Sequence, residues 1–289
     1  MTTPHAPHAA ALQRTVADFR AAWEQAHQRM PRRTGVPDIH RLPPEFIPWF
    51  CGATPLGFLS AGRAQLLATH LAPCRRQAHR MDWDAAGWTT AARSAALQGA
   101  LHELRAQGHL NGWRNEEFAL CAEGSDVPLL QAERAGFYFL GMRSDAVHVN
   151  GFRADARMWL ARRSAAKHVD PGLLDNLCAG GVTAGETPET CLQRELYEEA
   201  GIRLDAKHLL RFCGTTEVGR VRDGGWHVER LHVYNLLLQA DERPCNRDGE
   251  VQEFLLPTAA ELAGLVHEGQ CTPDAAAAIV RGLELPLRA

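Results

Sequence analysis

The stretch that decides the fold runs from residue 180 to residue 202 and reads GGVTAGETPETCLQRELYEEAGI. Its second half carries the signals of a helix. Thr187 is a good N-cap, Pro188 suits the first helical position, and Gly201 suits the position just beyond the last turn. The stretch therefore predicts a glycine-rich turn followed by a helix that begins at Pro188 and ends before Gly201.

Three glutamates of this predicted helix lie three and four residues apart, so they share one face. They are Glu195, Glu198 and Glu199. Carboxylates packed this closely repel each other, and a divalent cation relieves that repulsion. Magnesium, or manganese in its place, prefers such oxygen ligands and shares them with substrate phosphates. The sequence therefore predicts a metal site at these three glutamates, with the carbonyl of Gly180 as a further ligand.

Nine positions of the stretch form one spaced pattern, G-x5-E-x7-R-E-U-x-E-E-x-G-U, where U is a bulky apolar residue. They are Gly180, Glu186, Arg194, Glu195, Leu196, Glu198, Glu199, Gly201 and Ile202. Two neighbouring glutamates alone would indicate a solvated acidic helix, but the full pattern resembles the Nudix box. This resemblance to the Nudix hydrolase superfamily implies an α/β/α sandwich that hydrolyses a diphosphate. Within the stretch, Glu195 or Glu199 is our candidate for water activation, and we expect Arg194 to orient Glu198.

The 289 residues suffice for two domains, because a Nudix domain alone is shorter. The net charge of −3 comes from 31 basic and 34 acidic residues, so we expect neither a nucleic-acid nor a membrane partner. The first residues have no apolar signal core, which favours a cytoplasmic protein. The eight cysteines include no C-x-x-C pair, so they signal neither zinc nor redox chemistry.

Periodicity divides the chain into a disordered tail over 1–11, a smaller α+β domain over 12–140, and a Nudix domain over 141–289. In the α+β domain we expect helices over 12–28 and 89–107. The Nudix domain should have a mixed sheet, with hairpins over 147–162 and 220–238, and closing helices over 259–267 and 273–282. The second hairpin should turn at Asp223, since Asp-Gly between apolar runs favours a hairpin.

Outside the box, the chain resembles a Nudix subgroup that carries its own N-terminal α+β domain and is fused to thiamine pyrophosphokinase in some fungi. The matching segments are 55–58 (PLGF), 112–116 (GWRNE), 133–135 (ERA), 147–152 (VHVNGF), 161–164 (ARRS) and 171–176 (PGLLDN). This resemblance implies hydrolysis of damaged thiamine diphosphates, such as oxythiamine diphosphate, to the monophosphate.

Several residues outside the box are candidates for the substrate and the metal. Lys167 and Arg163 flank the entry to the box and suit a diphosphate clamp. His148 and Asn150 alternate with apolar residues, so they share one face of a strand and are candidate substrate contacts. Glu250 is the candidate for an additional acidic catalytic residue or metal ligand, and Glu253 and Glu217 are weaker ones.

Other functions stay open because the box addresses the diphosphate and not the group attached to it. The chain is alternatively an ADP-ribose or nucleotide-sugar pyrophosphatase. A diphosphate isomerase of the same fold needs a cysteine and a glutamate facing an alkene, and its box departs from this pattern. A non-catalytic metabolite sensor commonly loses box glutamates, whereas all remain here. A homodimer is a further expectation.

Overall fold

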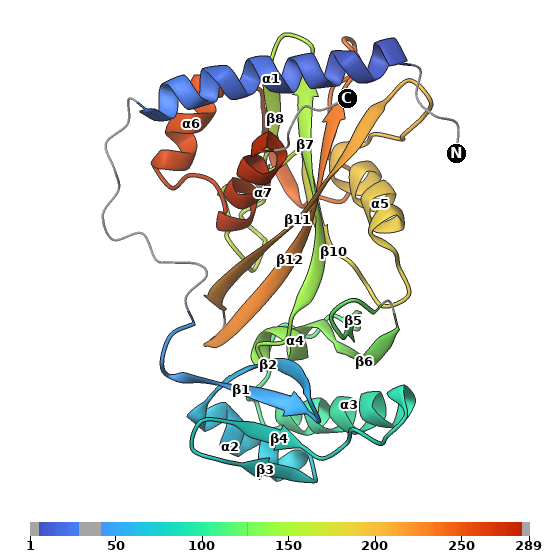
Figure 1. Cartoon of the computed structure of the whole chain (residues 1–289), viewed down its shortest axis with the longest axis vertical. Coiled ribbons are helices and arrows are strands. Elements are labelled where there is room, and N and C mark those ends of the chain that lie inside the picture. The colour runs from blue at the N-terminus through green and yellow to red at the C-terminus, as the bar shows by residue number, and fades with distance from the viewer. Residues whose placement is uncertain (1–5, 29–41, 126, 223, 285–289) are drawn as a thin grey trace.

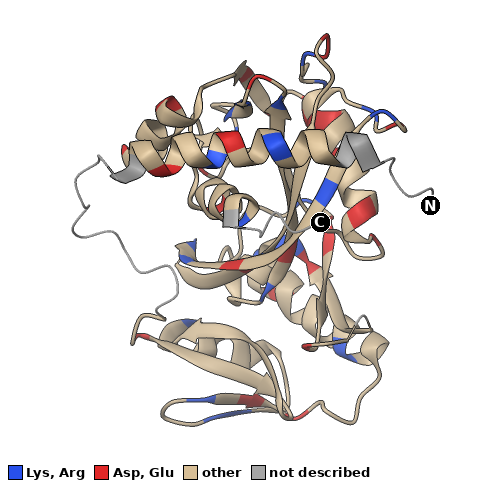
Figure 2. Cartoon of the chain, turned by 45° about the horizontal axis from the view of Figure 1, so that its top comes forward, with Lys and Arg blue, Asp and Glu red and all other residues tan. Residues whose placement is uncertain are grey.

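The computed structural model describes residues 6–28, 42–125, 127–222 and 224–284. In Figure 1 these residues form two regions, one above the other: a large sheet covered by helices, and a smaller α+β region beneath it. Among the described residues, no helix is long and apolar enough to cross a membrane. Figure 2 shows basic and acidic residues intermixed along the long N-terminal helix and around the large sheet.

The large sheet has the strand order β11-β12-β7-β8-β13, with β10 paired to β7 and β9 paired to β8. It is mixed, because β12 runs parallel to β7 while β11 and β8 run antiparallel to their neighbours. Its strands are β7 (Ser144–Arg153), β8 (Arg157–Arg163), β9 (Leu174–Asp175), β10 (Cys178–Gly181), β11 (Leu209–Arg222), β12 (Gly225–Leu237) and β13 (Val251–Leu255).

Helices cover both faces of this sheet, which confirms the predicted α/β/α sandwich. They are α5 (Pro188–Ala200) on one face, and α1 (Ala6–Gln28), α6 (Ala259–His267) and α7 (Pro273–Glu284) on the other. The strand β7 is buried on both sides: Val147 and Val149 pack with α5, whereas Asn150 donates a hydrogen bond to the carbonyl of Ala278 in α7. Strands buried on both faces carry few solvent-facing side chains.

Helix α1 differs from the prediction at its start. It begins at Ala6, so residues 6–11, which we expected in a disordered tail, are helical. It also packs outside the region to which we assigned it. Its residues Leu12, Val16 and Phe19 join a core with Phe152 of β7 and Leu262 of α6. The apolar stripe of α1 covers the large sheet, because that sheet leaves an apolar face that must be buried.

The smaller region contains a four-stranded sheet of order β2-β1-β4-β3 and a separate pair, β5 and β6. Its elements are β1 (Phe46–Cys51), β2 (Thr54–Ser60), α2 (Ala61–His70), β3 (Cys74–Arg76), β4 (Met81–Trp83), α3 (Thr90–Ala106), β5 (Glu117–Cys121), β6 (Pro128–Glu133) and α4 (Arg134–Phe139). Trp49 and Trp83 are fully buried in its core.

A close backbone contact joins the two regions at Gly141. The amide of Phe58 donates to the carbonyl of Gly141 over 3.1 Å, and Gly57 forms a bridge with Met142. Gly141 has a φ of +60°, and a Cβ there would collide with the carbonyl oxygen of Phe58. Only glycine fits both the conformation and the space. This contact places the N-terminal region against the large sheet.

The predicted local elements agree well with the structure. Thr187 accepts a hydrogen bond from the amide of Thr190 as the N-cap of α5, and Gly201 ends the helix in the left-handed conformation. The hairpins β7–β8 and β11–β12 are antiparallel as expected. The second is longer than predicted, since β11 begins at Leu209. Its turn residue Asp223 lies outside the described residues.

Candidate active site

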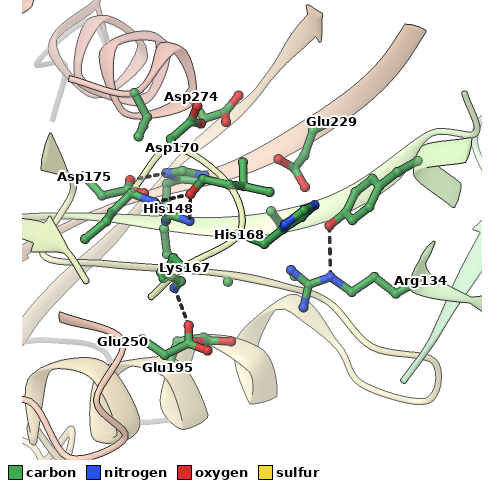
Figure 3. Close-up of a pocket in the computed structure, with 18 of the residues that line it drawn as sticks. Arg134, His148, Lys167, His168, Asp170, Asp175, Glu195, Glu229, Glu250 and Asp274 are labelled. Carbon is green, nitrogen blue, oxygen red and sulfur yellow. Dashed lines mark hydrogen bonds and ion pairs between the residues drawn. The ribbon is translucent and has the colours of Figure 1, made fainter. Parts of the chain in front are cut away.

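A cavity of about 200 Å³ opens between α5, the loop that follows β8, and the N-terminal region. In Figure 3, Glu195 and Glu250 lie on one side of it, Asp274 and Asp170 on the opposite side, and Arg134 points in from the N-terminal region. The walls therefore come from segments that are far apart in the sequence.

Arg194 holds the first group of carboxylates. Its guanidinium donates to both oxygens of Glu186, over 2.8 and 2.9 Å, to Glu195 over 2.5 Å and to Glu198 over 3.3 Å. These hydrogen bonds hold the pKa of Glu186 at about 2. Arg194 therefore binds Glu186 and Glu195 more closely than Glu198, the partner that the sequence suggested. A planar guanidinium suits this role because it binds carboxylates in a two-pronged geometry.

Lys167 binds a second group of carboxylates, Glu199 and Glu250. Its ammonium lies 3.2 Å from Glu199 and also forms an ion pair with Glu250. Glu199 is only 5% exposed, and this burial raises its pKa to about 7, with Lys167 opposing the effect and Glu195 adding to it. Burial likewise raises the pKa of Glu195, against the pull of Arg194. Buried carboxyls with raised pKa values are suited to exchange a proton near neutral pH.

The chemistry of these donors fits a divalent cation, although no preformed cage is present. Among the described residues, no three His, Cys, Asp or Glu side chains are gathered closely enough to hold a metal ion. Lys167 and Arg194 lie among the carboxylates instead and offset part of their negative charge. Glu195 lies directly against the backbone of Gly180, where any side chain would collide with the carboxylate. Glu195, Glu198, Glu199, Glu250 and the Gly180 carbonyl form an all-oxygen donor set of the kind that magnesium prefers.

Several predicted residues lie elsewhere or are engaged by the protein. Asn150 is fully buried, bonded to Asn235 and Ala278, and does not line the cavity. Arg163 lines it, but its guanidinium is taken up by Asp175 and by the carbonyl of Val169. Its observed role is to hold the loop after β8.

Glu253 and Glu217, the weaker candidates for an additional acidic residue, do not line the cavity, whereas His148 does. Glu253 pairs with Arg162, and Glu217 lies near Arg143. His148 does line the cavity, with its Nδ1 2.7 Å from Asn176. Cys178, next to the box, is fully buried, and burial raises the pKa of its thiol.

The cavity also contains residues that the sequence did not indicate. From the N-terminal region come Arg114, Glu116, Arg134 and Tyr138, and from the sheet and α7 come Arg220, Arg222, Glu229 and Asp274. Arg220 joins the loop to α7, since it bonds to Asp170 over 2.6 Å and to Asp274 over 2.5 Å. Only the segments 112–116 and 133–135, noted for their resemblance, gave a signal for any of these residues.

Comparison with known families assigns both regions. Residues 142–274 match the family model described as "NUDIX domain", and residues 41–144 match "Domain of unknown function (DUF4743)". An uncharacterised Nudix hydrolase of Nostoc is 40% identical over 149 residues, which are 50% of this chain and 83% of the relative. The chain therefore belongs to the Nudix hydrolase family, with a DUF4743 region before the Nudix domain.

Other relatives share more of the chain but are longer proteins. Nudix hydrolase 24, chloroplastic, of Arabidopsis thaliana is 30% identical over 203 residues, covering 65% of this chain and 52% of the relative. Nudix hydrolase 20, chloroplastic, of the same plant is 30% identical over 179 residues, covering 61% and 48%. The chain thus spans about half the length of these relatives. The crystal structure of DR0079 from Deinococcus radiodurans is 23% identical, with a TM-score of 0.47, over 57% of this chain and 98% of that one.

Proposed function

We propose that the protein hydrolyses a phosphoric anhydride bond in a small diphosphate, with magnesium or manganese as its cofactor. The observation that carries this proposal is the row of carboxylates Glu195, Glu198 and Glu199 on α5, facing Glu250 across Lys167. An acidic row of this kind destabilises a fold unless positive charge balances it, and Lys167 and Arg194 balance it only in part.

In this proposal, the side chains divide the chemistry. A bound divalent cation would neutralise phosphate charge and promote ionisation of the attacking water. Glu199 or Glu195 accepts the proton, because burial raises the pKa of both carboxyls, that of Glu199 to about 7. Arg194 positions Glu195, and Gly180 leaves the space that the Glu195 carboxylate occupies. Glu250 and Lys167 complete the wall toward the substrate.

We propose damaged thiamine diphosphates, such as oxythiamine diphosphate, as the substrates. The support is the sequence resemblance to the subgroup with its own N-terminal domain. The segments that carry this resemblance supply cavity residues: Arg114, Arg134, His148, Arg163 and Asp175.

A second candidate is ADP-ribose or a nucleotide sugar. The cavity is lined mainly by charged and polar side chains, among them Glu229, Asp274 and His148, with Tyr138 as a phenol ring. Such walls suit the many hydroxyl groups of a sugar better than they suit an apolar ring. This observation favours the second candidate independently of the resemblance.

The test is a panel assay of the purified protein with magnesium. The panel contains thiamine diphosphate, oxythiamine diphosphate, ADP-ribose, a nucleotide sugar and a nucleoside triphosphate, with release of phosphate and monophosphate followed. Highest kcat/KM on oxythiamine diphosphate supports the first candidate, and highest kcat/KM on ADP-ribose or the nucleotide sugar supports the second. Binding of a panel member without turnover would favour a metabolite sensor. A cytoplasmic location and a homodimer stay predictions.

A further inference from the structure

A second cavity, of about 480 Å³, adjoins the first on the side of the N-terminal region. The two share Arg114, Arg134, Tyr138, His168, Val169 and Arg222 as a common wall. The basic side chains that line the second cavity are Arg63, Arg114, Arg134, Arg222, His109 and His168. Within the described part of the chain, no aspartate or glutamate lines it. We call this second cavity the arginine pocket.

Arg222 is the most exceptional of these cations. No hydrogen bond or ion pair links its side chain to another described residue, and its Nε is buried without a partner. Its guanidinium lies 3.8 Å from the centre of the Tyr138 ring, which holds it by a cation–π contact. A guanidinium held in place with unused donors is suited to bind an anion.

Arg134 and Arg114 lie between the arginine pocket and the acidic helix. Arg134 donates to Glu116 over 2.8 Å and to the hydroxyl of Tyr138 over 2.9 Å, and its side chain points into the cavity in Figure 3. Arg114 approaches Glu250 only to 3.9 Å, and nearly half of its side chain is exposed. Both residues come from the N-terminal region, so the cations face α5 from the opposite wall.

The charge balance at the acidic helix explains why such cations are needed. Five carboxylates, Glu186, Glu195, Glu198, Glu199 and Glu250, meet two cations, Lys167 and Arg194, for a formal balance of −3 when all are ionised. One divalent cation still leaves this end negative, and a diphosphate adds more negative charge. Lys167 and Arg163, the cations that the sequence suggested for the phosphates, are already bonded to Glu199 and Asp175. The compensating charge must come from elsewhere.

We propose that the arginine pocket binds a phosphate group of the substrate, with Arg222, Arg134 and Arg114 as its ligands, so that the N-terminal region completes the active site. This inference rests on the proposed diphosphate hydrolysis. The acidic helix and its cation hold one side of the diphosphate, and the arginines hold the other. Two-pronged arginine contacts are well matched to phosphate oxygens.

The test measures phosphate binding without metal, so that it does not depend on turnover. Inorganic pyrophosphate is titrated calorimetrically into the full chain in EDTA, for the wild type, Arg222→Gln and Arg134→Lys. Loss of one charge-assisted contact in Arg222→Gln should weaken the Kd about tenfold to a hundredfold. Arg134→Lys keeps the charge but loses the fork, so its effect should be smaller. Arg75→Ala is the matched control, because Arg75 is a well-exposed arginine of the same region that pairs only with Asp84 among the described residues.

Kinetics on the best panel substrate give the second readout. Both variants should raise KM and leave the magnesium concentration for half-activation unchanged, since neither residue touches the acidic helix. Arg222→Gln should fold normally, as its side chain loses no hydrogen bond to a described residue, and its thermal unfolding checks this. Unchanged pyrophosphate affinity in both variants, or no pyrophosphate binding by the wild type, would overturn the proposal. Arginine-dependent binding in a protein without turnover would instead keep the pocket and reject hydrolysis.

Discussion

The two ends of the composite cavity are built in opposite ways. The acidic end takes Glu195, Glu198, Glu199 and Arg194, which binds Glu195 and Glu198, from one helix, α5. The arginine pocket takes its cations from α2, from the segment before β5, from α4 and from the end of β11. One end is therefore a local arrangement of neighbours in sequence, whereas the other exists only when four separate segments meet.

This difference suggests that the acidic end serves catalysis and the arginine pocket serves substrate binding. Helical spacing alone brings the three carboxylates of α5 to one face, and Lys167 and Glu250 join them from other segments. The opposite end depends on the contact between the N-terminal region and the large sheet at Gly141. Changes at the acidic end should therefore affect rate and metal use, and changes at the other end should affect substrate binding.

The largest effect should come from Glu199→Gln. The change keeps the shape of the side chain but removes a buried carboxylate of the acidic end, where the proposed metal ion would contribute several kcal/mol to the transition state. We expect kcat to fall about a hundredfold or more at saturating magnesium. Steady-state kinetics on the best panel substrate measures it, with circular dichroism to check the fold. Glu253→Gln, an exposed glutamate paired with Arg162, is the control. A kcat within a few-fold of the wild-type value would show that Glu199 has no catalytic role.

Lys167→Ala should show that this cation stands in for a metal in the free protein. Without Lys167, the buried Glu199 loses its ion-pair partner, and Glu250 loses one as well. Breaking a buried pair in this way costs about 3 kcal/mol of unfolding free energy. Magnesium should restore more stability to the variant than to the wild type. Urea denaturation with and without magnesium measures both effects, with the exposed Lys207→Ala as the control. Equal magnesium effects in wild type and variant would contradict this role.

Asp274 offers a test at the part of the cavity remote from α5. Burial raises its pKa to about 6, although Arg220 opposes the shift. The pKa in the folded protein therefore lies above that of an unfolded aspartate, about 3.9. The stability associated with protonated Asp274 is then fully present below about pH 4 and is lost as the pH rises through about 6. Between pH 4 and pH 7, the free energy of unfolding should fall by about 2 kcal/mol less in Asp274→Asn than in the wild type. Denaturant unfolding at several pH values measures it, and parallel curves for the two proteins would refute the assignment.

The smallest effect should come from a matched pair of helix caps. Thr187 caps α5 at the acidic end, and Thr89 caps α3 in the N-terminal region, each through a side-chain oxygen that accepts from a backbone amide. Replacement of either by alanine should cost about 1 kcal/mol of unfolding free energy. Only Thr187→Ala should also raise the magnesium concentration for half-activation, because only α5 carries the carboxylates. Equal magnesium responses would mean that the start of α5 does not affect the metal site.

The sequence predicted the parts of the site that depend on short spacing. The bounds of α5, its caps, and the common face of its glutamates follow from local rules, and the structure agrees with them. The roles of Lys167 and Arg163 were not predictable in the same way. Whether a basic side chain binds substrate or a protein carboxylate depends on which side chains from distant segments lie beside it. Here Lys167 lies beside Glu199 and Glu250, and Arg163 lies beside Asp175. Asn150 is a second example. Alternation along the strand predicted that it shares a strand face with His148, but α7 covers Asn150 and its side chain bonds to the protein instead of substrate.

By itself, the sequence determined the family, the mixed α/β sandwich and the acidic face of α5, because each is encoded in periodicity, caps and spacing within a few residues. Only the tertiary structure decided that α1 covers the large sheet, that Lys167 lies between Glu199 and Glu250, and that arginines of the N-terminal region face the acidic helix. The physical reason is that charge pairing and apolar burial act between surfaces. Those surfaces form only when segments far apart in the chain are packed together.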